Sequence, residues 1–143
     1  MKTILISLAS VFSIFFSNAQ SIQPETTIGT TITVTVPVKT NDGLIIAGLY
    51  DEATFMKAAP LQGAESTIID GKATLTFKNV TPGTYGITLF LDKNGNRTMD
   101  FEPNGMPKEM YGVSNNVMSY GPPQWKDAQF EVGTENLELE IIL

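Results

Sequence analysis

Short runs of the chain alternate strictly between apolar and polar side chains. In residues 31–36, Ile32, Val34 and Val36 share one face and threonines share the other. Residues 72–78 repeat the pattern, with lysines and threonines on the polar face. A period of two is typical of a β-strand with one buried face. From such alternation, or from a nearly continuous apolar run, we predict strands at residues 31–36, 44–50, 72–78, 85–91, 128–132 and 137–143.

Turn signals separate these runs. Residues 41–43 (Asn-Asp-Gly) and 70–71 (Asp-Gly) favour tight turns, so we expect a hairpin between the first two strands. Residues 51–63 could form one helical turn or an irregular crossover that Pro60 ends. Without a convincing amphipathic helix, the pattern predicts an all-β fold. We expect an antiparallel β-sandwich, immunoglobulin-like or prealbumin-like, of about seven strands.

The first residues have the composition of a secretory signal peptide. Lys2 supplies a positive charge, residues 4–16 are mainly apolar, and the small residues 17–19 form a cleavage site. The alternative is a retained membrane anchor, but the apolar run is shorter than the ~20 residues of a span. We therefore predict a signal peptide at residues 1–20 and a single mature domain at residues 21–143. The mature protein would be secreted or periplasmic, without a membrane span.

Composition excludes several kinds of chemistry. The chain of 143 residues has 15 Asp and Glu against 9 Lys and Arg, which gives a net charge of −6. This acidic balance argues against nucleic acid and anionic membranes as partners. The chain contains neither His nor Cys, which excludes Ser-His-Asp and Cys-His catalysis and the usual nitrogen and sulfur zinc sites. Carboxylate chemistry and oxygen-ligated metals remain.

Residues 92–100, directly after a predicted strand, form the most distinctive stretch of the chain. Short oxygen-bearing side chains occupy its first, third, fifth and ninth positions. A loop with this spacing curls around a point where those oxygens and a backbone carbonyl converge. Ca²⁺ takes about six to eight oxygen ligands, so we predict calcium as the cofactor. The candidate metal ligands are Asp92, Asn94, Asn96, Asp100 and the carbonyl of Thr98.

The match to an EF-hand calcium loop is partial. That pattern has Gly at its sixth position and a bidentate Glu at its twelfth, where this chain has Arg97 and Pro103. Glu102 or Glu109 could replace the missing ligand. The alternative is a polar hairpin turn without a cation, since Asn-Gly and Gly-Asn are strong turn signals.

Residues 101–125 form a long segment without clear periodicity. Its aromatic and methionine content is too high for disorder, so we expect it to pack on the sandwich beside the calcium loop. The rings of Tyr111, Tyr120 and Trp125 could stack on a sugar or could anchor the segment. We favour anchoring, because buried rings commonly hold long loops in place.

Three segments carry a recognisable combination of motifs. They are residues 80–85 (Val-Thr-Pro-Gly-Thr-Tyr), residues 92–100, and residues 105–116 with the pattern G-x-P-K-E-x-Y-G-x-S-N-N. Together they resemble the DUF2141 family of small secreted bacterial proteins of unknown function, over essentially the whole mature chain. The resemblance implies a secreted β-sandwich without an assigned activity. The first two segments are also similar, more weakly, to Cna-B-type surface modules, in which a similar loop binds Ca²⁺.

These features favour a non-catalytic module, a secreted and calcium-stabilised β-sandwich that binds an envelope or extracellular protein or glycan. We expect it to be a monomer. The alternative is a small glycoside hydrolase that uses paired carboxylates such as Asp100 and Glu109, although Asp100 is better explained as a cation ligand. A third possibility is a structural envelope protein in which the loop is only a turn.

Overall fold

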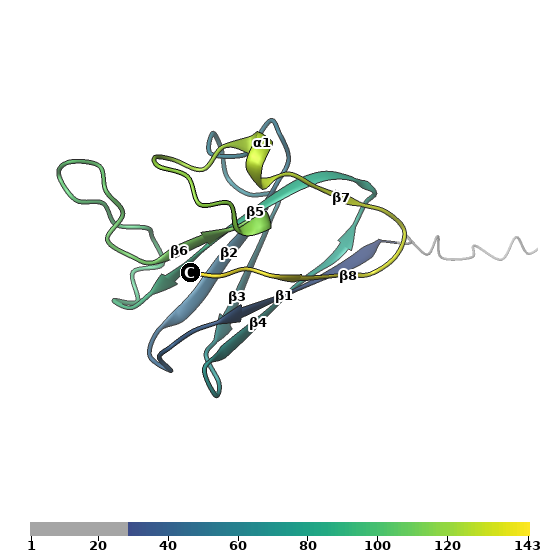
Figure 1. Ribbon diagram of the computed structural model, residues 1–143. Helices are drawn as coiled ribbons and strands as arrows, with labels where there is room; N and C mark the ends of the chain where they lie inside the picture. The colour runs from purple at the N-terminus through teal and green to yellow at the C-terminus, as the bar shows by residue number, and fades with distance from the viewer. Residues whose placement is uncertain (1–28) are drawn as a thin grey trace, which may run out of the picture.

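The computed structural model describes residues 29–143, so the predicted signal peptide and the domain start at residue 21 lie outside the described residues. The described chain is almost entirely strand and loop, which confirms the predicted all-β class (Figure 1). Its strands are β1 (Thr30–Pro37), β2 (Leu44–Tyr50), β3 (Gln62–Thr67), β4 (Lys72–Val80), β5 (Gly83–Asp92), β6 (Tyr111–Val113), β7 (Phe130–Val132) and β8 (Leu137–Glu140).

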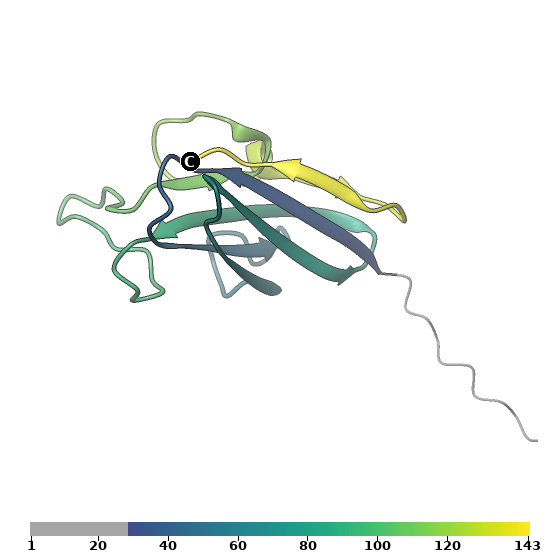
Figure 2. The same cartoon turned by 90° about the horizontal axis from the view of Figure 1, so that it is seen from below.

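The strands form two sheets that pack as the layers of a sandwich (Figure 2). One sheet has the order β4-β1-β8, and the other has the order β3-β2-β5-β6, with β7 also paired to β5. Among the described strands, neighbours are antiparallel except β1 and β8, which run parallel. The sandwich is as predicted, and the parallel pair is a departure from a purely antiparallel arrangement. It arises because β7 and β8 belong to different sheets, so the chain crosses between the layers to reach β1.

Alternating side chains from both sheets fill the space between the layers. Ile32, Val34 and Val36 of β1 are fully buried, whereas the threonines between them are partly exposed. Burying an aliphatic side chain of this size is worth about 1.5–3 kcal/mol relative to leaving it exposed. The alternation that predicts these strands is therefore also what holds the two sheets together. The other sheet contributes Ile45, Ala47, Leu49, Ile87, Leu89 and Leu91.

Several local features differ from the sequence-based expectation, including β6, which lies in the segment 101–125 where no strand is predicted. Residues 41–43 do not close a hairpin, because β1 and β2 belong to different sheets and the chain changes layer between them. The sequence pattern also fails to predict β3, whose polar sequence lacks apolar alternation. This strand pairs with β2 at an edge of the sheet, where little of it needs to be buried. The turn at residues 70–71 is confirmed, with both residues at positive φ.

β5 is the strand to which the rest of its sheet attaches. On one side it pairs with β2 along residues 86–92. On the other side it pairs with β7 at residues 83–85 and with β6 at residues 88–90. Two short strands thus share one edge of β5 and leave a gap between them.

A single buried hydroxyl group fills this gap. Ile87 lies between the two short partners of β5, and its N–H donates to Ser114 Oγ at 3.0 Å. The Ser114 hydroxyl, which is 1% exposed, donates in turn to the carbonyl of Ala128. It therefore replaces the missing strand pairing and joins β5 to the segments on both sides of the gap.

The helical segments are short. They are η1 (Ser114–Asn116) and α1 (Trp125–Ala128). Within residues 29–143, no helix has the length and apolar character needed to cross a membrane. The ring of Trp125 at the start of α1 packs against Phe55, with ring centroids 5.6 Å apart. Both rings lie over Gly86, where an added Cβ would come within 3.2 Å of each.

Replacing Ser114 with Ala should destabilise the fold. The change leaves the Ile87 N–H and the Ala128 carbonyl without a partner in a buried site, at a cost of about 1–3 kcal/mol. For a domain of this size, the melting temperature should fall by roughly 5–10 °C, as measured by circular dichroism. Ser119→Ala, at an exposed position, is the matched control. A shift in Ser114→Ala no larger than in this control would contradict the bridging role.

Candidate functional site

The candidate metal loop begins at Asp92, where β5 ends. Only 1% of this residue is exposed. One carboxylate oxygen accepts the N–H of Gly95 at 2.8 Å, and the other accepts the N–H of Arg97 at 2.9 Å. A buried carboxylate without such donors would be costly. The two bonds wind the chain around Asp92 and attach the loop to the end of the strand.

Asn94, Asn96 and Asp100 point toward one another. The side-chain oxygen of each Asn accepts a backbone N–H two residues further on, from Asn96 at 3.1 Å and from Thr98 at 3.0 Å. The two side-chain nitrogens donate to the same Oδ2 of Asp100, at 2.7 and 2.8 Å. The spacing in the sequence thus brings these three side chains together, and amide-to-carboxylate hydrogen bonds connect them in this structure.

The side chain of Glu109 bonds to this loop, whereas Glu102 lies in a separate turn. One carboxylate oxygen of Glu109 accepts the N–H of Asp100 at 2.8 Å. The backbone N–H of Glu102 instead donates to the carbonyl of Met106 at 2.7 Å, in a separate turn. Of the two acidic residues considered as additional ligands, the fold brings Glu109 to Asp100.

Hydrogen bonds hold the pKa of Asp100 below its usual range. The largest cause is the side-chain donor of Asn94, followed by that of Asn96, and burial partly offsets them. The neighbouring Glu109 and the positive charge of Lys108 lower this pKa further. The Asp100 carboxyl group is therefore held in its ionised form.

Arg97 occupies the position at which the EF-hand pattern has glycine. Its φ of 60° lies in the left-handed region, so the chain makes the sharp turn that glycine usually makes there. The guanidinium group forms an ion pair with Glu65 of β3, and this contact raises the pKa of Arg97. Both side chains are well exposed to water, so the pair contributes little to stability. It does connect the loop to the edge strand of the sheet.

The donor set suits Ca²⁺ in kind, because every candidate ligand offers an oxygen. Each oxygen that accepts one N–H keeps a second lone pair. Within the described part of the chain, no group of three or more His, Cys, Asp and Glu side chains could hold a metal. A cation in this loop would therefore depend on amide and carbonyl oxygens beside two carboxylates. The amide groups of Asn94 and Asn96 would have to turn their oxygens toward it.

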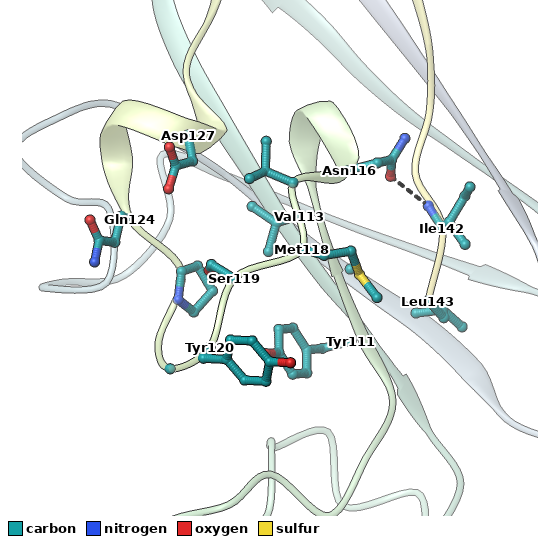
Figure 3. A pocket seen from close by; sticks show the side chains of 14 residues that line it. Tyr111, Val113, Asn116, Met118, Ser119, Tyr120, Gln124, Asp127, Ile142 and Leu143 are labelled. Atoms are coloured by element: carbon teal, nitrogen blue, oxygen red, sulfur yellow. Dashed lines mark hydrogen bonds between the residues drawn. The ribbon is translucent and has the colours of Figure 1, made fainter.

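A groove of about 630 Å³ lies between β6, the segment 117–124 and residues 142–143 (Figure 3). Its lining is mostly apolar, with polar groups at the end where α1 begins. The apolar side chains that line it include Tyr111, Val113, Met118, Tyr120, Ile142 and Leu143. A concave apolar surface with a few polar groups is typical of a binding site.

The expectation that residues 101–125 pack onto the sandwich is wrong for most large side chains of the segment. Met118 and Tyr120 are 98% and 109% exposed. Trp125 does anchor the segment through Phe55, as favoured from the sequence, but Tyr120 does not. The exposed large side chains are Phe101, Met106, Met110, Tyr111, Met118 and Tyr120.

The side chains of Asn115 and Asn116 bond to the backbone of two other segments, a role that the sequence analysis did not predict. Asn115 donates to two backbone carbonyls within residues 127–129, at 2.9 Å each. Asn116 donates to the carbonyl of Glu140 and accepts the N–H of Ile142, also at 2.9 Å. Both asparagines have positive φ, which Asn tolerates better than most residues. The Ser-Asn-Asn sequence was the available signal, since such side chains often bond to backbone groups.

The fold and the loop define a small β-sandwich domain with an oxygen-rich turn at the end of its central strand. The chain belongs to the family described as "Uncharacterized protein conserved in bacteria (DUF2141)", whose model matches residues 32–140. This match confirms the resemblance inferred from the motifs. Searches of curated proteins and of solved structures found no match.

Asp100→Asn should reduce the loss of stability in acid. Because the pKa of Asp100 is lowered in the folded state, its carboxylate stabilises the fold above the ordinary pKa of 3.8. This contribution disappears as the pH falls through the lower folded pKa. In EDTA, the melting temperature of the unmutated protein should fall more between about pH 6 and about pH 2.5 than that of the variant.

The matched control for this comparison is Asp42→Asn, at an exposed turn outside the loop. It should follow the unmutated protein across the same pH range. If Asp100→Asn also follows the unmutated protein, the hydrogen bonds from Asn94 and Asn96 do not stabilise the ionised carboxylate.

Proposed function

We propose that this protein is a secreted or periplasmic, non-catalytic β-sandwich module that binds an envelope or extracellular protein or glycan. We further propose that a calcium ion in the 92–100 loop stabilises it. The main support for the proposal is that Asn94, Asn96 and Asp100 converge next to the buried carboxylate of Asp92. The apolar start of the chain supports the location.

The charge balance of the loop supports a bound cation. The donors to the carboxylates of Asp92 and Asp100 are neutral amide groups. Neutral donors orient a carboxylate but leave its negative charge in place, whereas a divalent cation would neutralise it. Arg97, whose charge also acts on Asp92, is already paired with Glu65. Lys108 acts on Asp100 without forming a salt bridge to it. Calcium suits such flexible oxygen ligands better than Mg²⁺, which requires a tighter octahedron.

The carboxylates of the alternative hydrolase are poorly suited to catalysis. Asp100 accepts two amide donors, and Glu109 accepts the backbone N–H of Asp100. A glycosidase needs one carboxylic acid with a raised pKa, and the pKa of Asp100 is lowered. Neither residue lines the 630 Å³ groove. These contacts favour a role in holding the loop over a role in bond cleavage.

Exposed apolar side chains support a binding role. Five exposed apolar side chains line the same groove: Tyr111, Val117, Met118, Tyr120 and Ile142. Contiguous apolar surface on a small domain commonly marks an interaction site. The groove is the part of the described surface best suited to an external ligand.

Calcium should raise the melting temperature of the protein. With a dissociation constant of about 0.1 mM, in the range of extracellular calcium modules, ~1 mM Ca²⁺ stabilises the fold by roughly 1.4 kcal/mol. In a domain of this size that corresponds to a shift of roughly 5 °C, measured by calorimetry against EDTA. Mg²⁺ should give a much smaller shift.

Variants of the loop distinguish residues that bind the cation from a nearby residue that does not. Asp92→Ala and Asp100→Ala should each abolish the calcium shift, because each removes a carboxylate ligand. Arg97→Ala is the matched control and should keep it, since the guanidinium points to Glu65. Equal melting temperatures of the unmutated protein in calcium and in EDTA would show that the loop is only a turn.

Asn96→Asp should have opposite effects with and without calcium. In EDTA the new carboxylate loses the hydrogen bond to Asp100 and repels it, so the melting temperature should fall by roughly 2–5 °C. In calcium the added charge strengthens binding, so the calcium shift should be about twice that of the unmutated protein. Asn104→Asp, at a turn elsewhere in the same connection, should show neither effect. If the melting temperature of Asn96→Asp falls in EDTA and calcium does not restore it, the loop does not bind a cation.

A further inference from the structure

The free edge of β6 presents backbone hydrogen-bonding groups to the groove. β6 is the last strand of its sheet and pairs with β5 on one side only. The Leu91 N–H donates to the Met110 carbonyl at 2.9 Å. This bond shows which residues of the antiparallel pair are hydrogen-bonded to each other. Because antiparallel pairs alternate, the N–H and C=O groups of Tyr111 and Val113 point away from β5. Both residues line the groove.

The opposite wall of the groove is the segment 117–123, which the fold holds at its two ends. Asn116 fixes one end through Glu140 and Ile142, and α1 fixes the other through Trp125. In the chain from residue 29 onward, the backbone of the segment 117–123 makes no hydrogen bond to other backbone groups. A wall with few internal bonds can adjust to a ligand at little cost.

The groove contains an acidic side chain. Asp127 contributes the single charged side chain among the lining residues described. Within residues 29–143 its carboxylate has no ion-pair partner, because the salt bridge present joins Arg97 and Glu65. Figure 3 shows Asp127 at one end of the groove, with Tyr111 and Tyr120 at the other end. The groove therefore offers an apolar end and an acidic end.

We propose that the groove binds an extended segment of a partner protein, which adds to the sheet as a further strand beside β6. The backbone of the segment hydrogen-bonds to Tyr111 and Val113, as in other cases of strand addition. An apolar side chain packs among Tyr111, Met118 and Tyr120, and a Lys or Arg side chain faces Asp127. This inference rests on the proposed function as a binding module, and it specifies the ligand class as an apolar peptide strand with a basic residue.

Two other occupants suit the groove less well. Sugar sites surround an aromatic ring with polar side chains that are free to bond hydroxyl groups, but here Gln124 and Asp127 lie at the end of the groove away from the rings of Tyr111 and Tyr120. The amide of Asn116, which also lines the groove, already has its nitrogen and its oxygen bonded to backbone partners. A second copy of the chain would bring together two molecules of net charge −6, which repel each other.

The test is a selection from a displayed library of random peptides of about 12 residues, performed against the protein in calcium. We expect selected peptides to carry apolar residues at alternate positions and a Lys or Arg. Synthetic versions should bind with dissociation constants below about 100 μM in calorimetry. Methylating alternate backbone nitrogens of the peptide should weaken binding at least about tenfold, because it removes donors to β6.

Variants of the protein check the two ends of the groove. Tyr120→Ala should weaken peptide binding about tenfold through loss of one exposed ring, and Asp127→Lys should shift the preference from Lys to Glu at the charged peptide position. Ile69→Ala removes another exposed apolar side chain, at the turn before β4. It is the matched control and should leave binding unchanged.

Several results would overturn this inference. The first is that no selected peptide binds more tightly than about 1 mM. The second is that the protein binds a glycan and Tyr120→Ala abolishes this binding. The third is that light scattering shows a dimer and Tyr120→Ala dissociates it. A persistent calcium shift in the melting temperature, without hydrolysis of polysaccharides, would leave the proposed module intact in each case. Cleavage of a polysaccharide that Asp100→Ala abolishes would instead overturn the proposed function.

Discussion

The pairing of β5 on both of its edges is the constraint on which the rest of this structure depends. β2 covers one edge, and β6 and β7 share the other. The hydroxyl of Ser114 completes the shared edge where the two short strands leave a gap. That bridge links the central strand to the segments around α1 and η1 by hydrogen bonds. The inward side chains of β5 then complete a core to which both sheets contribute.

The same strand positions the candidate metal loop and the groove. Asp92 still pairs with Leu44 of β2, so the loop starts inside the sheet and from a buried carboxylate. The chain returns from the loop through Lys108, whose N–H donates to the Asp100 carbonyl at 2.8 Å, and then enters β6. The loop and the open edge of β6 are thus two ends of one connection. In Figures 1 and 2 this connection extends from one end of the sandwich.

Regular features of this fold were predictable because each depends on neighbouring residues in the sequence. Alternation located β1, β4 and β5 with their buried faces, and the spacing of Asp92 to Asp100 located side chains that do converge. The polar edge strand β3 gave no such signal. The layer change after β1 and the exposure of Tyr120 depend on contacts between distant segments, which local patterns do not encode. The hydrogen bonds of Asn115 and Asn116 belong to this second kind, since their partners lie around α1, at the end of β8 and just after it.

A crystal structure of the protein grown in calcium, with the anomalous signal of the ion recorded, would show directly whether the 92–100 loop binds a cation. We expect one peak in the 92–100 loop, bound by oxygens of Asp92, Asn94, Asn96 and Asp100 and by the carbonyl of Thr98. The amide groups of both asparagines would have turned their oxygens toward it. A loop without a peak, in which both amide nitrogens still donate to Asp100 Oδ2, would show that the loop is a turn and not a calcium site.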